Sequence, residues 1–387
     1  MATSIFRTNF PGTVKLQEAA DCADYIIGLD LHKKTTAVCV ISPKNPEQPV
    51  FQRKRLQNTE LLSTLHRFSG RKVIACEAAY GWHQLAHALD AMHDVTFVPL
   101  DARKTASWIK TSGIKNDKID AQVLCAACLH GGIGRLAVYR TSEHAHECTK
   151  LVRHRDSLVQ QAASIKRQLA AFEHAYGPNP YTGEIPQQST RASAMLSDLR
   201  SSLLCLKDRI ASVEVMMKQE SKDDTVITRL RSIPGIGPIT AFALRHKVED
   251  INRFESPARL SGYIGLSIRE RQSGESTVKG KIAKTGDALI RRLLIQGAQA
   301  VRTLKPDLVP LYFPNIGQDA LMAERRHRNK VVTALARKNL TFAWHIWKKE
   351  EDFDLQRYRE RRSHVVTDRV PSRGAELECR LSVKDAR

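Results

Sequence analysis

Apolar positions between Tyr25 and Leu129 form short runs of strand length that alternate with stretches of helical period. The short runs are rich in β-branched residues, as buried strands usually are. They predict strands over residues 25–29, 35–41, 50–54, 72–76 and 95–98, and helices over residues 61–68, 82–92 and 121–129. Three early strands followed by alternating helix and strand favour a mixed α/β sheet.

A seven-residue period governs the next stretch, where Leu151, Leu158, Ile165 and Phe172 recur. A break rich in Pro and Gly follows over residues 177–186. Apolar residues then stand alternately three and four apart, at Leu196, Leu199, Leu203, Leu206, Ile210, Val213 and Met217. Such spacing is the a/d seam of a coiled coil. It predicts two long helices that form either an antiparallel hairpin within one chain or a coiled coil that joins two chains.

The rest of the chain is expected to be mostly helical as far as Phe353, and charged and disordered beyond it. The pattern therefore predicts five segments. They are an N-terminal tail over 1–24, an α/β domain over 25–145, a coiled-coil helical hairpin over 146–222, a helical domain over 223–353 and a charged tail over 354–387.

Charge narrows the choice of partner. Lys and Arg number 61 against 41 Asp and Glu, a formal net charge of +20. Such a surplus is costly in self-repulsion unless the partner is a polyanion, and nucleic acid rewards it through counterion release. The eight cysteines are scattered, mostly in apolar runs, and neither a secretory signal nor a membrane-length apolar run occurs. We expect a cytoplasmic protein, associated with the nucleoid when active and without a membrane partner.

Four acids occupy positions suited to metal binding. Asp30 and Glu77 end predicted strands, and Asp117 and Asp120 share one face at the start of a predicted helix. Each acid taken alone fits the role of a turn former or helix cap better than that of a metal ligand. Together, oxygen ligands in one crevice suit Mg²⁺ or Mn²⁺, and two such ions can stabilise the attacking and leaving oxygens of a phosphodiester displacement.

Two further motifs suit phosphate. The run 232–238 carries Gly235 and Gly237 and resembles a helix-hairpin-helix turn, whose backbone N–H groups can approach DNA, although it also fits a plain turn. Downstream, Ser273 and Ser276 stand among cations that could hold a phosphate, namely Arg269, Arg271, Lys279, Lys281, Lys284, Arg291 and Arg292. A serine needs activation to act as a nucleophile, and a phosphate-binding loop is the alternative.

A zinc site is not expected. Cys125, Cys128 and His130 imitate half of one, and His144, His146 and Cys148 follow, but no second cysteine pair completes the spacing.

The ordered set of motifs resembles the DEDD transposases of the IS110 insertion-sequence family, which are related to Piv-type DNA invertases. The resemblance runs from Tyr25 to about Phe353, and residues 329–352 are closest to the IS1111 branch. The matching runs are Gly28-Leu29-Asp30, Cys76-Glu77-Ala78, Asp117-Lys118-Ile119-Asp120-Ala121, Ile233-Pro234-Gly235-Ile236-Gly237, Gly265-Leu266, Ser273-Gly274 and Lys284-Thr285-Gly286-Asp287.

The resemblance implies a RuvC-like, ribonuclease-H-type N-terminal domain, a coiled-coil linker and a helical transposase domain. It implies that Asp30, Glu77, Asp117 and Asp120 form the DEDD site and that Ser273 is the nucleophile, with Ser276 as the competing position. It also implies dimers that pair into tetramers, and an element-encoded bridge RNA that pairs with donor and target DNA. The alternatives are a RuvC-like junction resolvase, which needs no serine, and a non-catalytic nucleic-acid-binding relic.

Overall fold

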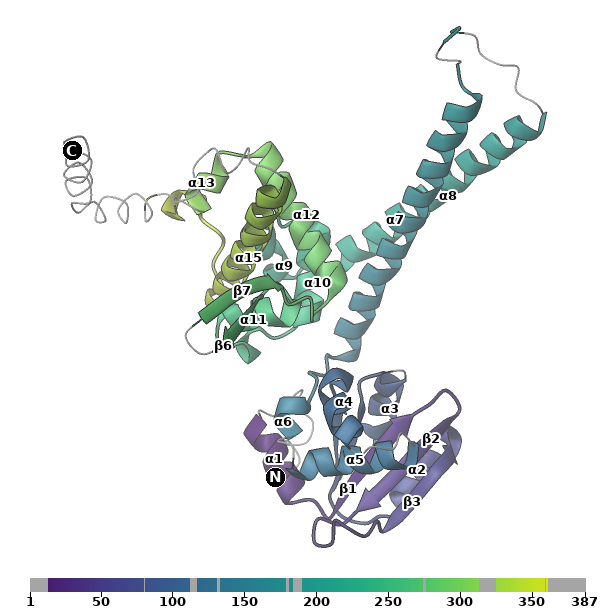
Figure 1. The fold of residues 1–387 in the computed structure, drawn as a ribbon, viewed down its shortest axis with the longest axis vertical. Coiled ribbons are helices and arrows are strands. Elements are labelled where there is room, and N and C mark those ends of the chain that lie inside the picture. The colour runs from purple at the N-terminus through teal and green to yellow at the C-terminus, as the bar shows by residue number, and fades with distance from the viewer. Residues whose placement is uncertain are drawn as a thin grey trace, which may run out of the picture. The chain divides into compact units, whose positions relative to one another are not determined.

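The computed structural model describes residues 13–79, 81–111, 117–130, 133–178, 181–183, 190–273, 276–312, 325–358 and 360. The chain forms two compact units, Met1–Ser142 and Glu143–Arg387, and each is described by itself (Figure 1). Across the described ranges, no helix combines the length and apolar character needed to span a membrane.

A five-stranded mixed sheet forms the centre of the first unit. Its strands are β1 (Tyr25–Leu31), β2 (Thr35–Ile41), β3 (Phe51–Gln57), β4 (Lys72–Glu77) and β5 (Val95–Leu100). Their order across the sheet is β3-β2-β1-β4-β5. The first three strands form an antiparallel meander, and β4 and β5 continue parallel to β1.

Helices cover both faces of this sheet. Strand alternation sends Ile26 into a core shared with α1 (Thr13–Asp21), α5 (Asp117–His130) and α6 (Ile133–Leu136). It sends the next residue, Ile27, into a core shared with α2 (Asn58–His66) and α3 (Trp82–Leu89). Helix α4 (Ala102–Thr111) follows β5 and packs beside α5. The expected mixed α/β sheet is therefore confirmed, with every predicted strand present.

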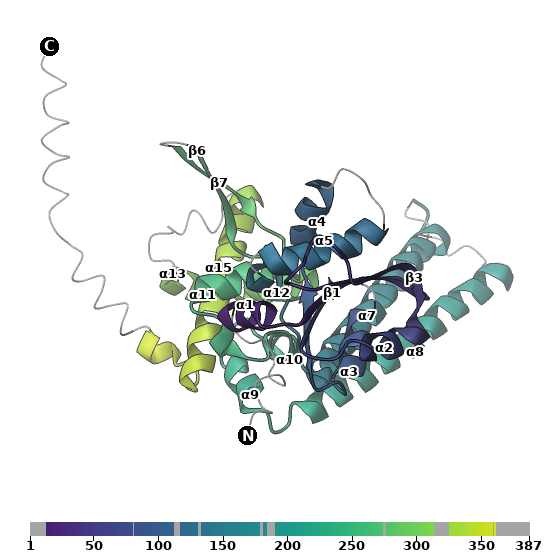
Figure 2. The same cartoon turned by 90° about the horizontal axis from the view of Figure 1, so that it is seen from below.

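Two long helices open the second unit, α7 (Glu143–Tyr176) and α8 (Thr190–Glu220), and they lie side by side as a hairpin (Figures 1 and 2). Leu158 of α7 and Leu206 and Val213 of α8 are buried in the same core. The heptad residues are thus used, at least in part, to join the two helices of one chain.

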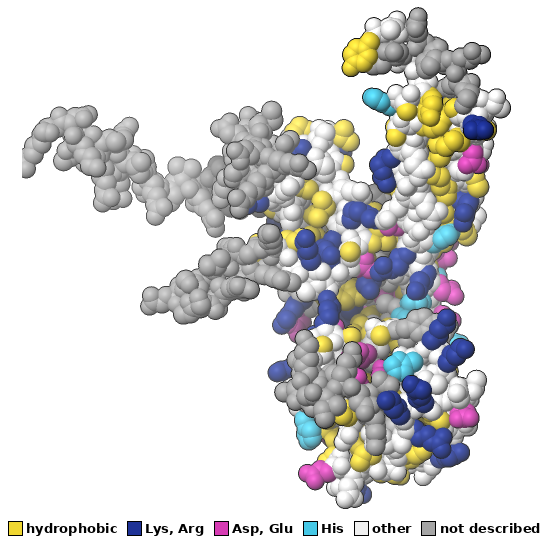
Figure 3. Space-filling model, turned by 45° about the vertical axis from the view of Figure 1, so that its right-hand side comes forward, with side chains coloured by type: hydrophobic (Ala, Val, Ile, Leu, Met, Phe, Trp, Pro, Cys, Tyr) yellow, Lys and Arg dark blue, Asp and Glu magenta, His cyan; other side chains and the backbone are white. Residues whose placement is uncertain are grey.

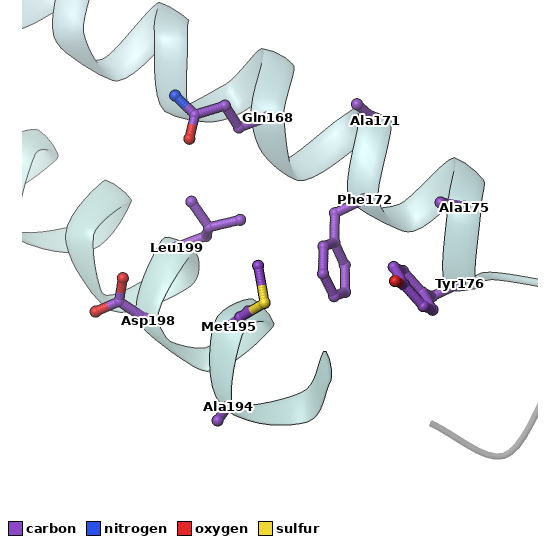
Figure 4. A pocket seen from close by; sticks show the side chains of 9 residues that line it. All are labelled: Gln168, Ala171, Phe172, Ala175, Tyr176, Ala194, Met195, Asp198 and Leu199. Atoms are coloured by element: carbon purple, nitrogen blue, oxygen red, sulfur yellow. The ribbon is translucent and has the colours of Figure 1, made fainter. Parts of the chain in front are cut away.

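Near the end of the hairpin where α7 stops and α8 starts, a groove of about 670 Å³ lies between the two helices. Phe172 and Tyr176 of α7 face Met195 and Leu199 of α8 across it (Figure 4). The lining is mostly apolar, and Met195 is 58% exposed. Asp198 is the one carboxylate among the lining side chains.

The remainder of the second unit is mainly helical. Its elements are α9 (Thr225–Arg231), α10 (Pro238–Val248), the 3-10 turn η1 (Ile251–Arg253), α11 (Pro257–Ile264), β6 (Ile268–Ser273), β7 (Ser276–Ile282), α12 (Ala288–Leu304), α13 (Leu308–Tyr312) and α15 (Arg325–Lys349). The antiparallel ribbon β6–β7 departs from the helical expectation, and it projects from the helices of its own unit (Figure 2).

The packed part of this unit extends beyond the expected boundary at Phe353. Leu355 and Tyr358 pack against the helical core, and the Tyr358 ring lies 5.1 Å from that of Phe342 and 5.9 Å from that of Tyr312. An apolar residue every third position is enough to dock one helical turn. Most of the charged tail lies outside the described residues.

Candidate active site

Asp30 and Glu77 stand at the ends of neighbouring parallel strands. Leu29 of β1 pairs with Cys76 of β4, so the two acids come next at the same level. Ile26 and Ala75 face the core that contains α5. Asp30 comes four residues after Ile26 in β1, and Glu77 comes two residues after Ala75 in β4, so each acid shares a face of the sheet with that residue. Strand alternation therefore directs both carboxylates to the face that α5 covers.

Helix α5 approaches β1 very closely because residue 28 is glycine. A Cβ at Gly28 would lie 2.0 Å from the carbonyl oxygen of Ala121 and 3.0 Å from Cys125 Sγ. One turn further, the Cys125 thiol donates to the carbonyl oxygens of Cys39 at 3.4 Å and Ile26 at 3.7 Å. Helix α5 thus runs antiparallel to β1, and its N-terminal end points the same way as the Asp30 end of the strand.

The first turn of α5 therefore reaches the level of Asp30. The helix rises about 6 Å from Ala121 back to Asp117, and the strand rises about 7 Å from Gly28 to Asp30. Asp120, within this turn, is half-buried and its Oδ1 is shielded from solvent. The Asp117 side chain lies outside the described residues, although its backbone begins α5.

Two polar side chains hold the strand-end acids. Thr105 of α4 is fully buried, and its hydroxyl donates to Glu77 Oε1 at 2.5 Å. His32 Nε2 lies 3.5 Å from Asp30 Oδ2, and the Asp30 side chain is 23% exposed. Burial, followed by the negative charges of Glu77 and Asp30, raises the pKa of the Cys76 thiol well above its usual range. That thiol is therefore a neutral core group beside the acids.

This arrangement suits hard divalent cations in an open site. Among the described residues, the oxygens of Asp30, Glu77 and Asp120 do not come within 4.8 Å of one another as a group of three. Mutual repulsion of carboxylates favours such separation. A pair of Mg²⁺ ions about 3.5–4 Å apart accommodates wider spacing than one ion does.

Ser273 and Ser276 are cross-strand partners at the turn end of the β6–β7 ribbon. The candidate cations Arg269, Arg271, Lys279 and Lys281 belong to the strands of this ribbon, and the side chains of all six residues lie outside the described part. Lys284, just past the ribbon, is exposed and has a positive φ of 56°.

Arg291 has a different environment from the one expected. Its guanidinium is half-buried and donates to the carbonyl oxygens of Gly286 at 2.6 Å and Ile264 at 3.1 Å. At the same place, a Cβ on Gly286 would lie 2.1 Å from the carbonyl oxygen of Tyr263. Arg291 therefore fastens the chain on the two sides of the ribbon, where phosphate contact was expected.

Arg292 is also engaged within its unit, because it pairs with Asp156 of α7. Beside it, Asp287 caps α12 by accepting from the backbone N–H of Leu289 at 3.0 Å and pairs with Arg153 of α7 at 2.5 Å. These two ion pairs hold α12, and with it the ribbon, against α7.

The glycine turn divides into a packed half and an exposed half. Gly235 has φ 90°, and a Cβ on Gly297 of α12 would lie 1.9 Å from its carbonyl oxygen, so this glycine serves close packing. Gly237 is exposed, has open space around its Cα and precedes α10, whose first residue is Pro238. The turn does connect two helices, α9 and α10, and Gly237 is the half that a phosphate can reach.

Surface charge agrees with the composition. The face of the molecule in Figure 3 carries many Lys and Arg side chains, scattered over both units, and fewer Asp and Glu. A surface of this kind favours a polyanionic partner.

Thr105, His32, Arg153 and Asp156 contact candidate site residues, and sequence analysis did not identify them. A lone threonine in a helix of mixed polarity carries no signal of its partner. Asp287 belongs to one of the matching motifs, which is a weak signal, but only the fold shows what it caps.

Two family models match the chain. One, described as "Transposase" and belonging to the IS110 DEDD type, matches residues 27–178, and the other, described as "Transposase IS116/IS110/IS902 family", matches residues 227–312. The first match covers the sheet with Asp30, Glu77, Asp117 and Asp120, and the second covers the glycine turn and the ribbon.

Curated relatives align over most of their length. The transposase of insertion sequence element IS1111A from Coxiella burnetii is 26% identical, over 85% of this chain and 91% of the relative. The IS1328 transposase from Yersinia enterocolitica is 28% identical, over 82% and 95%. A pilin gene-inverting protein from Moraxella lacunata is 24% identical, over 85% and 97%.

Proposed function

Because this chain belongs to the IS110-type DEDD transposases, enzymes that cleave and rejoin DNA, we propose that it transposes a DNA element through a covalent serine–DNA intermediate. The observation that carries the proposal is the convergence of Asp30, Glu77 and the first turn of α5 on one edge and one face of the sheet. The sheet order β3-β2-β1-β4-β5, with an antiparallel meander first, supports a RuvC-like, ribonuclease-H-type assignment.

The donor set fits divalent metal. Asp30, Glu77, Asp117 and Asp120 would hold Mg²⁺ or Mn²⁺ through carboxylate oxygens, the ligands that these ions prefer. When bound, such ions lower the barrier to displacement at a phosphodiester by stabilising developing negative charge on the oxygens. Thr105 would orient Glu77, since its hydroxyl is already committed to one carboxylate oxygen.

The proposed nucleophile is Ser273. Its Oγ would form a bond to the scissile phosphorus as the bond from phosphorus to a deoxyribose oxygen breaks. The hydroxyl loses its proton to water and the departing oxygen gains one, so protons balance. A hydroxyl group of another DNA strand then attacks the same phosphorus, which breaks the bond to the serine oxygen and joins the strands. A phosphoserine keeps the phosphodiester bond energy for rejoining, whereas hydrolysis would lose it.

Recognition of DNA is proposed for cations in and beside the ribbon and for backbone N–H groups. Lys284, the ribbon residues Arg269, Arg271, Lys279 and Lys281, and the N-terminus of α10 at Gly237 are the candidates. Arg291 and Arg292 are proposed to position the ribbon, because their guanidinium groups already contact Gly286 and Asp156. An element-encoded bridge RNA as guide rests on the family resemblance and on the net charge of +20.

A dimer that pairs into a tetramer is proposed on the same resemblance. Part of α8 is available for it, since Leu204, Val215 and Met216 are large apolar residues that stay exposed outside the hairpin seam. Leu204 and Val215 are eleven residues apart, which puts them on nearly the same face of α8. A coiled coil between chains would use this face, because Leu206 is buried within the chain.

The test is to trap the adduct. Purified protein is incubated with Mg²⁺, element-end DNA and the element's noncoding RNA, denatured, and digested for mass spectrometric mapping of the modified peptide. Adduct on Ser273 is expected in the parent protein and in Ser276→Ala, and none in Ser273→Ala or Asp30→Ala. Adduct on Ser276 would overturn the choice of serine.

Two other results would favour the alternative functions. Free DNA ends without any adduct would indicate a junction resolvase that uses water. Nucleic-acid binding with no cleavage under any metal would indicate a non-catalytic relic. Binding measured in parallel, by mobility shift, separates loss of chemistry from loss of folding.

A further inference from the structure

Three potential metal ligands from separate parts of the second unit meet at one place. His144 and Cys148 come from the first turns of α7, and His246 comes from the last turn of α10. One ligand atom from each lies within 4.8 Å of the other two, and within the described ranges no other group of His, Cys, Asp or Glu does this. None of the three belongs to the proposed transposition chemistry.

The pair from α7 has the spacing that metal sites on helices use. His144 and Cys148 are four residues apart, so they share one helical face. His144 Nε2 and Cys148 Sγ are 3.8 Å apart. A nitrogen and a sulfur ligand on one tetrahedral Zn²⁺ would be about 3.5 Å apart, from bond lengths of about 2.0 and 2.3 Å. The side chains thus stand close to a metal-binding separation without rearrangement.

A fourth possible ligand stands beside His144, outside the group of three whose atoms lie within 4.8 Å of one another. Glu220, the last residue of α8, has Oε1 3.1 Å from His144 Nε2. Nitrogen and oxygen on a shared tetrahedral zinc would be about 3.3 Å apart. A thiolate and a carboxylate together would balance the two charges of the ion, and nearby Arg245 is already paired with Asp224 at 2.7 Å.

Independently of this spacing, His246 has a buried nitrogen in need of a partner. The residue is 95% buried, being 5% exposed, and its Nε2 has no hydrogen-bond partner in the described structure. Leaving such a group unsatisfied costs about 1–3 kcal/mol. The His144 ring lies edge-on to it, with centroids 5.6 Å apart.

We infer that His144, Cys148 and His246 form a structural Zn²⁺ site, which Glu220 beside His144 would complete as fourth ligand. Soft thiolate with imidazole favours zinc over Mg²⁺, and four protein ligands make a closed site. The ion would join the start of α7, the end of α8 and α10, and would therefore fix the base of the helical hairpin to the helical region that carries the ribbon. Binding would displace the Cys148 proton, since the thiolate is the form that binds metal.

The first experiment measures metal content. Full-length protein, purified without a metal-affinity tag and dialysed against metal-free buffer, is analysed for zinc by plasma mass spectrometry. We expect about one Zn²⁺ per chain. Cys148→Ser should lower this to below about 0.1. The matched control Cys205→Ser, which changes an exposed cysteine of α8, should retain the full amount.

Two of the four proposed zinc ligands are partly exposed, so variants at these positions should keep the fold. His144 is 60% exposed on its side chain and Glu220 43%, so His144→Gln and Glu220→Gln remove a ligand without opening the core. His154→Gln, at another exposed position of α7, is the control. We expect both ligand variants to bind zinc at least about 10-fold more weakly than the control does.

Cobalt replaces zinc in the second measurement. Apoprotein titrated with Co²⁺ should develop the visible d–d bands of tetrahedral cobalt and a thiolate-to-cobalt charge-transfer band, and Cys148→Ser should lose the charge-transfer band. Absence of zinc from the parent protein, or full retention in Cys148→Ser with an unchanged cobalt spectrum, would overturn the site. The four residues would then form only a His144–Glu220 ion pair beside a buried thiol.

Discussion

Replacing Gly28 with alanine should disturb the acidic site from outside it. The added Cβ would lie 2.0 Å from the carbonyl oxygen of Ala121, and ordinary contact begins at 3.4 Å. The difference, 3.4 minus 2.0, requires α5 to move away from β1 by about 1.4 Å. Neither partner can yield by a rotamer change, because the contact is with backbone and Gly28 lies in a strand paired on both sides.

This movement has two measurable consequences. Overpacking of this kind costs about 1–3 kcal/mol, which for a unit of this size lowers Tm by about 3–9 °C. Asp117 and Asp120 move with α5 while Asp30 and Glu77 stay on the sheet, and a misplacement of about 1 Å at a catalytic group costs on the order of 100-fold in rate.

Thermal unfolding and strand cleavage at saturating Mg²⁺ provide the assay. Gly262→Ala is the control, because a Cβ at Gly262 meets nothing within 4 Å. A large loss of cleavage with a modest loss of Tm is expected for Gly28→Ala and neither for the control. Unchanged Tm and cleavage in Gly28→Ala would refute the close approach of α5, and with it the placement of its first turn beside Asp30.

Four further outcomes are expected. Thr105→Val should raise the Mg²⁺ concentration needed for half-maximal cleavage by about 10–100-fold, whereas Thr105→Ser should behave like the parent protein. Equal Mg²⁺ dependence of cleavage in all three proteins would dismiss an orienting role for Thr105. Leu206→Asp should lower the free energy of unfolding by about 3–5 kcal/mol, because it buries a charge in the α7–α8 seam. Leu204→Asp should change only the mass measured by light scattering, and the reverse pattern would place Leu206 between chains. A mixture of the Asp30→Ala and Ser273→Ala proteins should recover part of the cleavage activity if two protomers share a site. Activity no greater than the sum of the activities of the two separate variants would limit catalysis to one chain. Arg291→Lys should lower adduct yield with little change in DNA affinity, since one ammonium cannot hold both carbonyl oxygens, and a matching loss of affinity would make Arg291 a DNA contact.

The sheet was predictable because each strand obeys a local rule. Strands buried on both faces appear as continuous apolar runs, as in Thr35–Ile41 and Lys72–Glu77. Helix α4 was not predicted, because it is short and polar on average, and two of its four apolar residues are alanines. The β6–β7 ribbon was not predicted either, since its largely polar and charged sequence lacks the alternation that identifies a half-buried strand.

The candidate site was predictable to the same extent as the sheet. Acids at the ends of Tyr25–Leu31 and Lys72–Glu77 could be placed together, because parallel neighbours end at the same edge. The contacts of Arg291 and Arg292 within their own unit could not be foreseen, since a guanidinium has the same appearance in sequence whether it contacts a carbonyl, a carboxylate or a phosphate. His246 with Cys148 shows the limit most clearly, because a ligand set drawn from helices far apart along the chain has no spacing rule.

The two halves of the proposed chemistry are held by elements of very different rigidity. Asp30 and Glu77 sit on central strands of a five-stranded sheet, with partners on both sides of β1 and β4. Metal coordination needs this, because ligand positions must hold to a fraction of an ångström. Ser273 instead stands on an isolated two-stranded ribbon, an element that is marginally stable in water without support. At the root of the ribbon, Arg291 holds both sides.

This division fits a nucleophile that exchanges partners. A serine that attacks one DNA strand and then releases it to another must accept two substrates in turn, while the charge-stabilising site stays the same for both steps. Arg291 fixes the root of the ribbon, and DNA contacts made by the ribbon residues would then place Ser273 for attack. The energy for that placement would come from phosphate contacts made only when substrate is present, which ties serine attack to correct DNA engagement.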